Sequence, residues 1–249
     1  MGSSHSIVLE LPVVLCAETH RSLGYVQRQQ TEPIELPLFA PIASFEFPNI
    51  AKHYPILFFN DDAVFPVAIT GQVGSGGAVY APNPTNMQPY LPGVMQLYPF
   101  MLEKLPDQDA GVLIFDQKSA QLTPLTENHS AAALFNDAGA PTETLHQIAS
   151  FAAQLFDGRR RAAAFALALK AAGVLTPSLL EFNEMEPAGL KQHRLYMINE
   201  PAYRALPKDT VHDWFLKGWL DLASLVLVTQ RHWLNYRHHA EAPARATGS

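Results

Sequence analysis

The sequence predicts an α+β fold in which an N-terminal half of short, mostly antiparallel strands packs on a helical C-terminal half. The first half alternates short apolar runs with prolines and glycines, a pattern typical of strands joined by turns. The second half carries apolar residues at helical spacing and ends in a long apolar stretch, which predicts a buried last helix. We expect one domain over residues 1–249, with a β-rich part at about 6–125 and a mainly helical part at about 141–239.

The β-rich half is centred on the segment Phe47–Gln72. Asn49 is a suitable N-cap for a helical turn, which Pro55 then stops. The apolar runs Ile56–Phe59 and Phe65–Thr70 follow on either side of an acidic turn and predict a hairpin. Other elements are expected around it: a strand at Ser6–Leu15, edge strands within Glu32–Phe47, a short helix at Gly93–Tyr98, and a strand at Gly111–Phe115 with Gln121–Thr123 beside it.

The helical half has clear start and stop signals. A helix is expected from Pro141 to its C′ residue Gly158, and a second, alanine-rich helix from Arg159 to Ala172. A hairpin of strands then precedes Asn199, which caps a short helix. The remaining elements are the strands Leu179–Met185 and Arg194–Ile198, and a long helix from Asp209 to about His239 with a joint at Gly218.

The composition and charge of the chain limit the kinds of partner and the compartment that we expect. The formal charge is −6 and the basic residues do not cluster beyond Arg159–Arg161, which argues against nucleic-acid binding because that needs clustered cations. Cys16 is the single cysteine and fits a reducing compartment. Glu10 and Pro12 interrupt the apolar segment near the N-terminus, and no apolar run reaches the ~20 residues of a membrane span. We therefore expect a cytoplasmic protein that does not span a membrane.

Motifs that would carry catalysis or hold a cofactor are missing from the sequence. The ten histidines form no HExxH pattern, so we expect no metal. The glycine-rich loop Gly71–Gly77 has neither the Gly-Lys-Ser/Thr end of a Walker loop nor a helix after it, which favours a turn between strands over a phosphate site. The sequence contains no G-x-S-x-G elbow. We assign no catalytic residues and no cofactor.

The candidate ligand-binding residues stand at breaks between the expected elements. They are His53, Tyr54, Asp137, Asn199 and Glu200. Each also has a purely structural interpretation: Tyr54 packs, His53 bonds a backbone carbonyl, Asp137 suits a turn, Asn199 caps a helix and Glu200 suits a first helical turn. A site would require these side chains to meet, so we expect at least two of the three segments to line one cleft between the two halves.

Five ordered segments of the chain resemble those of a bacterial family, SapC, named after a surface-layer gene cluster. The segments are APIASFEFPNIAKHYPILFF, YLPGVMQLYPFML, LFNDAGAPTE, MINEPAYRAL and GWLDLASLVLVTQRHWLNY, between about residues 38 and 236. Gln96 and Leu97 depart from the pair of arginines typical of relatives, so an anion contact made there by relatives would be missing here. The resemblance implies a role near bacterial surface or uptake systems and supplies no catalytic residues.

Three functions stay open at this point. The first is a non-catalytic binding or accessory protein for a peptide or small-molecule ligand. We favour it because the sequence contains no coherent set of catalytic residues. The second is an enzyme that modifies a peptide or an aromatic metabolite. The third is a structural subunit of a surface-layer assembly, against which the lack of an export signal counts. A homodimer is compatible with each of them.

Overall fold

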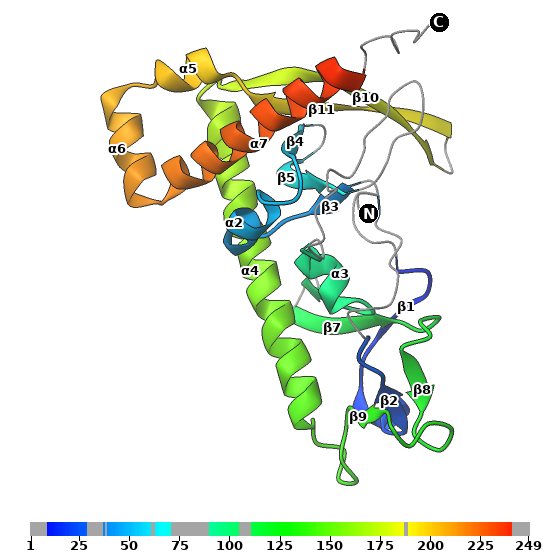
Figure 1. Cartoon of the computed structure of the whole chain (residues 1–249). Helices are drawn as coiled ribbons and strands as arrows, with labels where there is room; N and C mark the ends of the chain where they lie inside the picture. Colours follow the sequence, from blue (N-terminus) through cyan, green and yellow to red (C-terminus); the bar gives the residue numbers. More distant parts are fainter. Residues whose placement is uncertain are drawn as a thin grey trace, which may run out of the picture. The chain divides into compact units, whose positions relative to one another are not determined.

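The computed structural model describes residues 9–28, 37, 39–60, 63–70, 90–104, 111–186 and 189–240, with side chains outside 179–193 and 232–240 (Figure 1). The glycine-rich loop, the acidic turn at 61–62 and the first residues of the chain lie outside these ranges. The fold is α+β, as predicted. The chain forms two compact units, each discontinuous in sequence: unit 1 comprises Met1–Leu36 and Leu91–Arg159, and unit 2 comprises Pro37–Tyr90 and Arg160–Ser249. The single-domain interpretation stays a prediction.

Unit 2 contains a five-stranded antiparallel sheet. The predicted hairpin is confirmed, with Ile56 opposite Ala68 and Asn60 opposite Val64. The long hairpin near residue 187 joins this sheet through Leu195 and Tyr196. The order is β10-β11-β4-β5-β3, which places the proline-containing strand at an edge as expected. The strands are β3 (Phe39–Pro41), β4 (Ile56–Asn60), β5 (Val64–Ile69), β10 (Leu175–Glu186) and β11 (Gly189–Ile198).

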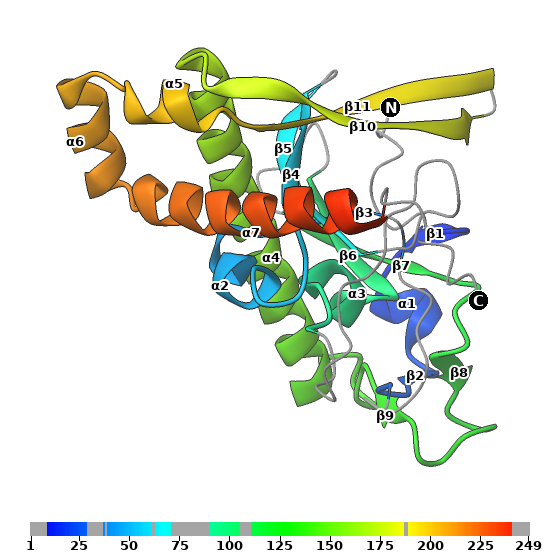
Figure 2. The same cartoon turned by 45° about the horizontal axis from the view of Figure 1, so that its top comes forward.

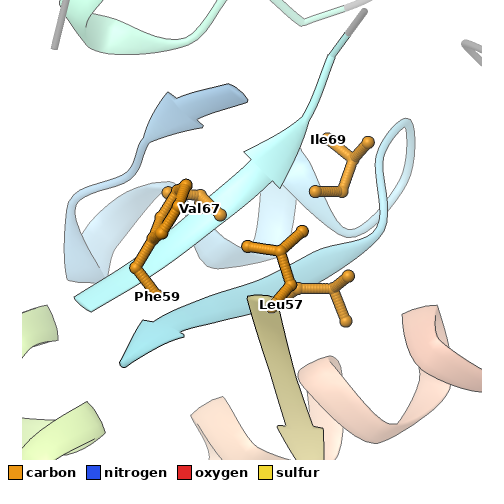
Figure 3. Close-up of a cluster of buried hydrophobic side chains, with 5 residues drawn as sticks. Leu57, Phe59, Val67 and Ile69 are labelled. Carbon is orange, nitrogen blue, oxygen red and sulfur yellow. The ribbon is translucent and has the colours of Figure 1, made fainter. Parts of the chain in front are cut away.

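The central hairpin of unit 2 is buried on both faces. Alternate residues of β4 and β5 point to one side and form a cluster with Leu195 of β11 (Figure 3). Phe58 points to the other side, where its ring lies 6.2 Å from that of Phe165. Burial on both faces explains why these strands are continuous apolar runs rather than alternating ones. The cluster consists of Leu57, Phe59, Val67, Ile69 and Leu195, each at most 1% exposed.

The helices of unit 2 end in the predicted long helix, which lies beside β4 and β11 (Figures 1 and 2). Gly218, with φ of +68°, is the expected joint because L side chains rarely adopt this backbone conformation. One face of the last helix is buried through Ala223 and Val226, whereas Val228 is exposed, so burial covers one face only. The helical elements are η1 (Ser44–Glu46), α2 (Phe47–Ile50), α5 (Glu200–Arg204), α6 (Lys208–Leu216) and α7 (Trp219–Ala240).

Unit 1 contains two small sheets, of order β1-β7-β6 and β8-β2-β9. The segment expected to pair beside Gly111–Phe115 instead pairs with β2, where Thr123 lies opposite Gly24. A Cβ on Gly24 would stand 2.7 Å from the side chains of Ala131 and Leu125, so a glycine is needed for this close approach. The elements are β1 (Pro12–Val14), α1 (Ala17–His20), β2 (Leu23–Tyr25), α3 (Gly93–Leu97), β6 (Phe100–Lys104), β7 (Gly111–Asp116), β8 (Leu122–Pro124) and β9 (Ala132–Ala133).

The two helices expected around Gly158 are one helix, α4, which runs from Glu143 to Ala171 (Figure 1). The prediction of a break was wrong because a glycine inside a helix costs only about 1 kcal/mol relative to alanine. The alanine-rich segments on both sides favour continuation. The end at Gly173 was predicted correctly: its φ is +67°, and the Val174 N–H donates back to the Leu169 carbonyl at 3.1 Å.

We predict that Thr229→Val destabilises unit 2. The buried Thr229 Oγ1 accepts a hydrogen bond from the Ile56 N–H at 3.2 Å and donates to the Val226 carbonyl at 2.9 Å. Valine keeps the shape but leaves the Ile56 N–H without this acceptor at the start of β4. The expected loss in the free energy of unfolding is about 1–3 kcal/mol, measured by urea denaturation. Thr210→Val in α6 is the control, and an equal loss in both variants would contradict the role of Thr229.

Candidate functional site

A pocket in unit 1 is bordered by α3, β6 and the first part of α4. Its empty space, including the part open to solvent, is about 450 Å³. Val94 and Leu97 line it from α3, and Phe100–Leu102 line it from β6. Leu9 and Tyr98 complete this side. The lining is therefore mainly apolar, as is usual for pockets that take small molecules.

The α4 side of the pocket is one helical face. Ala152, Leu155, Phe156 and Arg159 line it, at spacings of three, four and seven residues from the first. Residues at these spacings lie on the same side of an α-helix. Arg159 is half-buried and stands at the end of this apolar face. The pocket therefore has apolar walls and one cation at one end of the helix face.

Asp116, at the end of β7, fixes the position of two lining segments. Its carboxylate is 1% exposed and accepts hydrogen bonds from the backbone N–H groups of Glu10 at 3.0 Å and Leu11 at 3.1 Å. It also accepts from the Lys118 N–H at 3.1 Å and from the Tyr98 hydroxyl at 3.2 Å. These bonds hold the segment after Leu9 and the turn after α3 against the same strand end.

The pKa values of Asp116 and Tyr98 follow from this arrangement. Burial raises the pKa of Asp116, but its backbone hydrogen-bond donors and the Tyr98 hydroxyl outweigh burial and bring the pKa below its ordinary value of 3.8. Burial raises the pKa of Tyr98, and the adjacent Asp116 carboxylate adds to the rise. At neutral pH the carboxylate is charged and the phenol keeps its proton.

His53 and Tyr54, the first of the sequence-predicted segments, lie between α2 and β4 in unit 2. Tyr54 is buried, and burial raises the pKa of its hydroxyl to about 12. The two rings are 6.1 Å apart. Among the residues that the structure describes, no hydrogen-bond partner reaches the buried Nδ1 of His53. The packing expected for Tyr54 is confirmed, and a ligand contact by His53 stays a prediction.

Asn199 and Glu200 have local partners. The Asn199 side chain accepts from the Ala202 N–H at 3.1 Å, which confirms the predicted cap of α5. Glu200 Oε1 pairs with Arg204 at 2.7 Å and also with Arg231 of α7. Hydrogen bonds from Arg231 and Arg204 lower the pKa of Glu200 to about 2. Glu200 thus joins α5 to α7 as an ionised carboxylate.

The contacts of these two segments lead to different sides of α7. Ile56, just after Tyr54, bonds Thr229, whereas Glu200 bonds Arg231, two residues further along the helix. Two residues rotate a helix by about 200°, so these contacts give the segments no common cleft. Asp137 is exposed and lies in unit 1. A convergence of the three segments stays a prediction.

The turn that contains Asp137 is organised by its neighbour. Asn136 Oδ1 accepts from the Ala138 N–H at 3.0 Å and from the Ala140 N–H at 2.9 Å. Gly139 in the same turn has φ of +79°. The turn itself was predicted, but the side chain that holds it is Asn136.

Two further buried polar side chains in unit 2 were not identified from sequence. Glu46 is fully buried and accepts from the Ala43 N–H at 2.7 Å and the Tyr90 hydroxyl at 3.2 Å. Gln230 of α7 is 2% exposed, and neither of its amide atoms has a hydrogen-bond partner within the described ranges. Over the same ranges, no three His, Cys, Asp or Glu side chains are grouped as a metal site would require.

Among the helices that the structure describes, none combines the length and the apolar content needed to cross a bilayer.

Comparison with known proteins identifies the family. A family model described as SapC matches residues 15–235, which is most of the chain. The chain belongs to the SapC family. No curated protein and no solved structure gives a match.

Sequence reasoning on this SapC-family chain did not find the pocket. The residues chosen from sequence were polar ones at breaks, whereas the pocket is formed by apolar residues of regular elements. One signal was available: the face Ala152, Leu155 and Phe156 continues to Arg159 at helical spacing. The expected break at Gly158 separated Arg159 from that face.

We predict that Asp116→Asn destabilises unit 1 by about 2–3 kcal/mol at pH 7, because hydrogen bonds to a charged acceptor are the stronger ones. Since folding lowers the pKa of Asp116, its carboxylate stabilises the folded state above the unfolded-state pKa of about 3.9. This contribution is lost as pH falls through the folded-state pKa. Urea denaturation should therefore show the difference between variant and wild type shrinking below about pH 4.

The exposed Asp137 provides the matched control for this measurement, because it lies in the same unit. Asp137→Asn should leave the free energy of unfolding nearly unchanged. A difference between Asp116→Asn and wild type that is constant from neutral to acid pH would contradict the electrostatic role of Asp116.

Proposed function

We propose that this SapC-family protein is a binding protein that holds the apolar part of a small molecule or peptide in the pocket of unit 1. The observation that carries the proposal is the pocket itself, with about 450 Å³ of empty space and a mainly apolar lining. Pockets with mainly apolar walls and a few polar groups are the usual sites of small ligands. The resemblance to the SapC family supports a role near bacterial surface or uptake systems as part of this proposal.

The residues around the pocket support binding rather than chemistry. Among the described lining residues, the groups with reactive potential are the Tyr98 hydroxyl and the Arg159 guanidinium. Tyr98 already donates to Asp116, and its pKa is raised, which makes its phenolate harder to form. Arg159 stays protonated at physiological pH and acts as a fixed charge. The assignment therefore follows the first of the three functions, without catalysis.

Burial of apolar surface is the expected source of affinity. A short alkyl chain that enters the pocket leaves water and gains about 0.8 kcal/mol for each CH₂ group that becomes fully buried. Most of the lining comes from α3, β6 and α4, so the alkyl chain would mainly contact regular elements.

The test uses 1-hexanol as a neutral, slim probe. Saturation-transfer NMR on the full chain should show saturable binding, and Val94→Phe should weaken it at least about tenfold by filling the pocket. Val94 is half-buried in α3, so a larger side chain has space to extend into the pocket. Val112→Phe, at a half-buried valine of β7 away from the pocket lining, is the matched control.

Circular dichroism should confirm that both variants fold. Hexanol binding that is absent from wild type, or that Val94→Phe and Val112→Phe weaken equally, would contradict the proposal.

A further inference from the structure

We infer that the ligand of this pocket is an amphipathic anion: a short apolar chain between α3, β6 and α4 that ends in a carboxylate at Arg159. This inference rests on the proposed binding function and adds the chemical class of the ligand. The shared chemistry is a carboxylate on an apolar chain, which a small organic acid or the C-terminus of a peptide can supply.

The position of Arg159 on α4 sets the distance between the two parts of the ligand. Leu155 and Arg159 are four residues apart on one face, which corresponds to about 6 Å along the helix axis. Ala152 lies about 10 Å from Arg159 along the same axis. A chain of five or six carbon atoms spans this range, with its apolar end against Ala152 and Leu155 and its acid group at the guanidinium.

The guanidinium suits a carboxylate better than a neutral polar group. It is always charged, and it presents five N–H donors in a planar fork that matches two carboxylate oxygens. Because Arg159 is half-buried beside apolar walls, solvent screens its charge less than that of an exposed arginine. The side chain can keep contacts within the protein and still offer further donors to a ligand.

Two acidic groups near the pocket already have partners among the residues that the structure describes. Asp116, which holds Tyr98, is 1% exposed, and its charge is distributed over four hydrogen bonds from the protein. Glu10, next to the lining residue Leu9, pairs with Lys118 at 3.2 Å. Arg159 is the cation among the lining residues of this pocket that the structure describes.

The decisive comparison is between hexanoate and hexanamide, which have the same chain and differ in charge at neutral pH. On the full wild-type chain, ligand-observed NMR titration should give hexanoate a Kd at least about tenfold lower than hexanamide. Arg159→Gln should remove this preference by weakening hexanoate, while hexanamide binding stays within about twofold. Arg159→Lys, which keeps the charge without the fork, should retain part of the preference.

The exposed Arg161 gives a matched control on the same helix. Arg161→Gln removes one positive charge outside the pocket and should leave the preference for hexanoate intact. A preference that survives Arg159→Gln, or one that Arg161→Gln abolishes equally, would overturn the assignment to Arg159. Circular dichroism and thermal unfolding of each variant establish that the comparison is made on folded protein.

A second pair of probes, N-acetyl-leucine and N-acetyl-leucinamide, distinguishes a peptide C-terminus from a small organic acid as the source of the carboxylate. A charge preference in this pair, lost in Arg159→Gln, indicates a peptide C-terminus, and a preference confined to hexanoate indicates a small organic acid. Equal affinity for acid and amide in both pairs would overturn the inference but leave the proposed binding function standing. Absence of binding by both neutral amides and by 1-hexanol would overturn the proposed function itself.

Discussion

One buried carboxylate, Asp116, is the constraint on which the candidate site of unit 1 depends. A charge with 1% exposure is costly unless donors surround it, and here three backbone N–H groups and one phenol do so. Two of these donors, at Glu10 and Leu11, are more than a hundred residues away in sequence. The pocket takes Leu9 from one tethered segment and Tyr98 from the other. Without the charge at Asp116, two walls of the pocket would lose their common anchor.

Unit 2 is stabilised in a different way, by apolar burial around a local hairpin. The cluster in Figure 3 fills one face of β4 and β5, and Phe58 with Phe165 fills the other. Polar groups in this unit serve the joints between elements: Thr229 bonds the start of β4, and Glu200 links α5 to α7. Gln230 and His53 are among the exceptions, since the buried amide of Gln230 and the buried Nδ1 of His53 have no partner in the part of the chain that the structure describes. A buried amide of this kind is a usual position for an ordered water.

The sequence predicted the elements that short-range chemistry determines. Pro55 and the apolar runs after it predicted the hairpin, Gly218 predicted the joint before α7, and Asn199 predicted its cap. The errors concern features that distant contacts determine. Pairing of Leu122–Pro124 with β2 depends on a strand about a hundred residues earlier. Continuity of α4 through Gly158 is consistent with the small cost of a glycine inside a helix and with one buried face on each side of it, at Leu155 and Ala162.

The same distinction explains why the pocket of unit 1 was not found from the sequence. Polar side chains between secondary-structure elements are often interpreted as functional. At such positions, however, backbone N–H groups lack partners within a helix or strand. The side chains of Asn199 and Asn136 accept hydrogen bonds from backbone N–H groups of this kind. The pocket of unit 1 has the opposite pattern: its lining is mainly apolar, with one arginine at the edge. On α4 that pattern is a stripe from Ala152 to Arg159, visible in the sequence once the helix is known to continue. The environment expected for Arg159 therefore depends on whether the helix continues through Gly158. As the first residue of a separate helix, Arg159 would be a solvated cation. On the continuous helix α4, it stands at the end of the apolar face that begins at Ala152, and it borders the pocket.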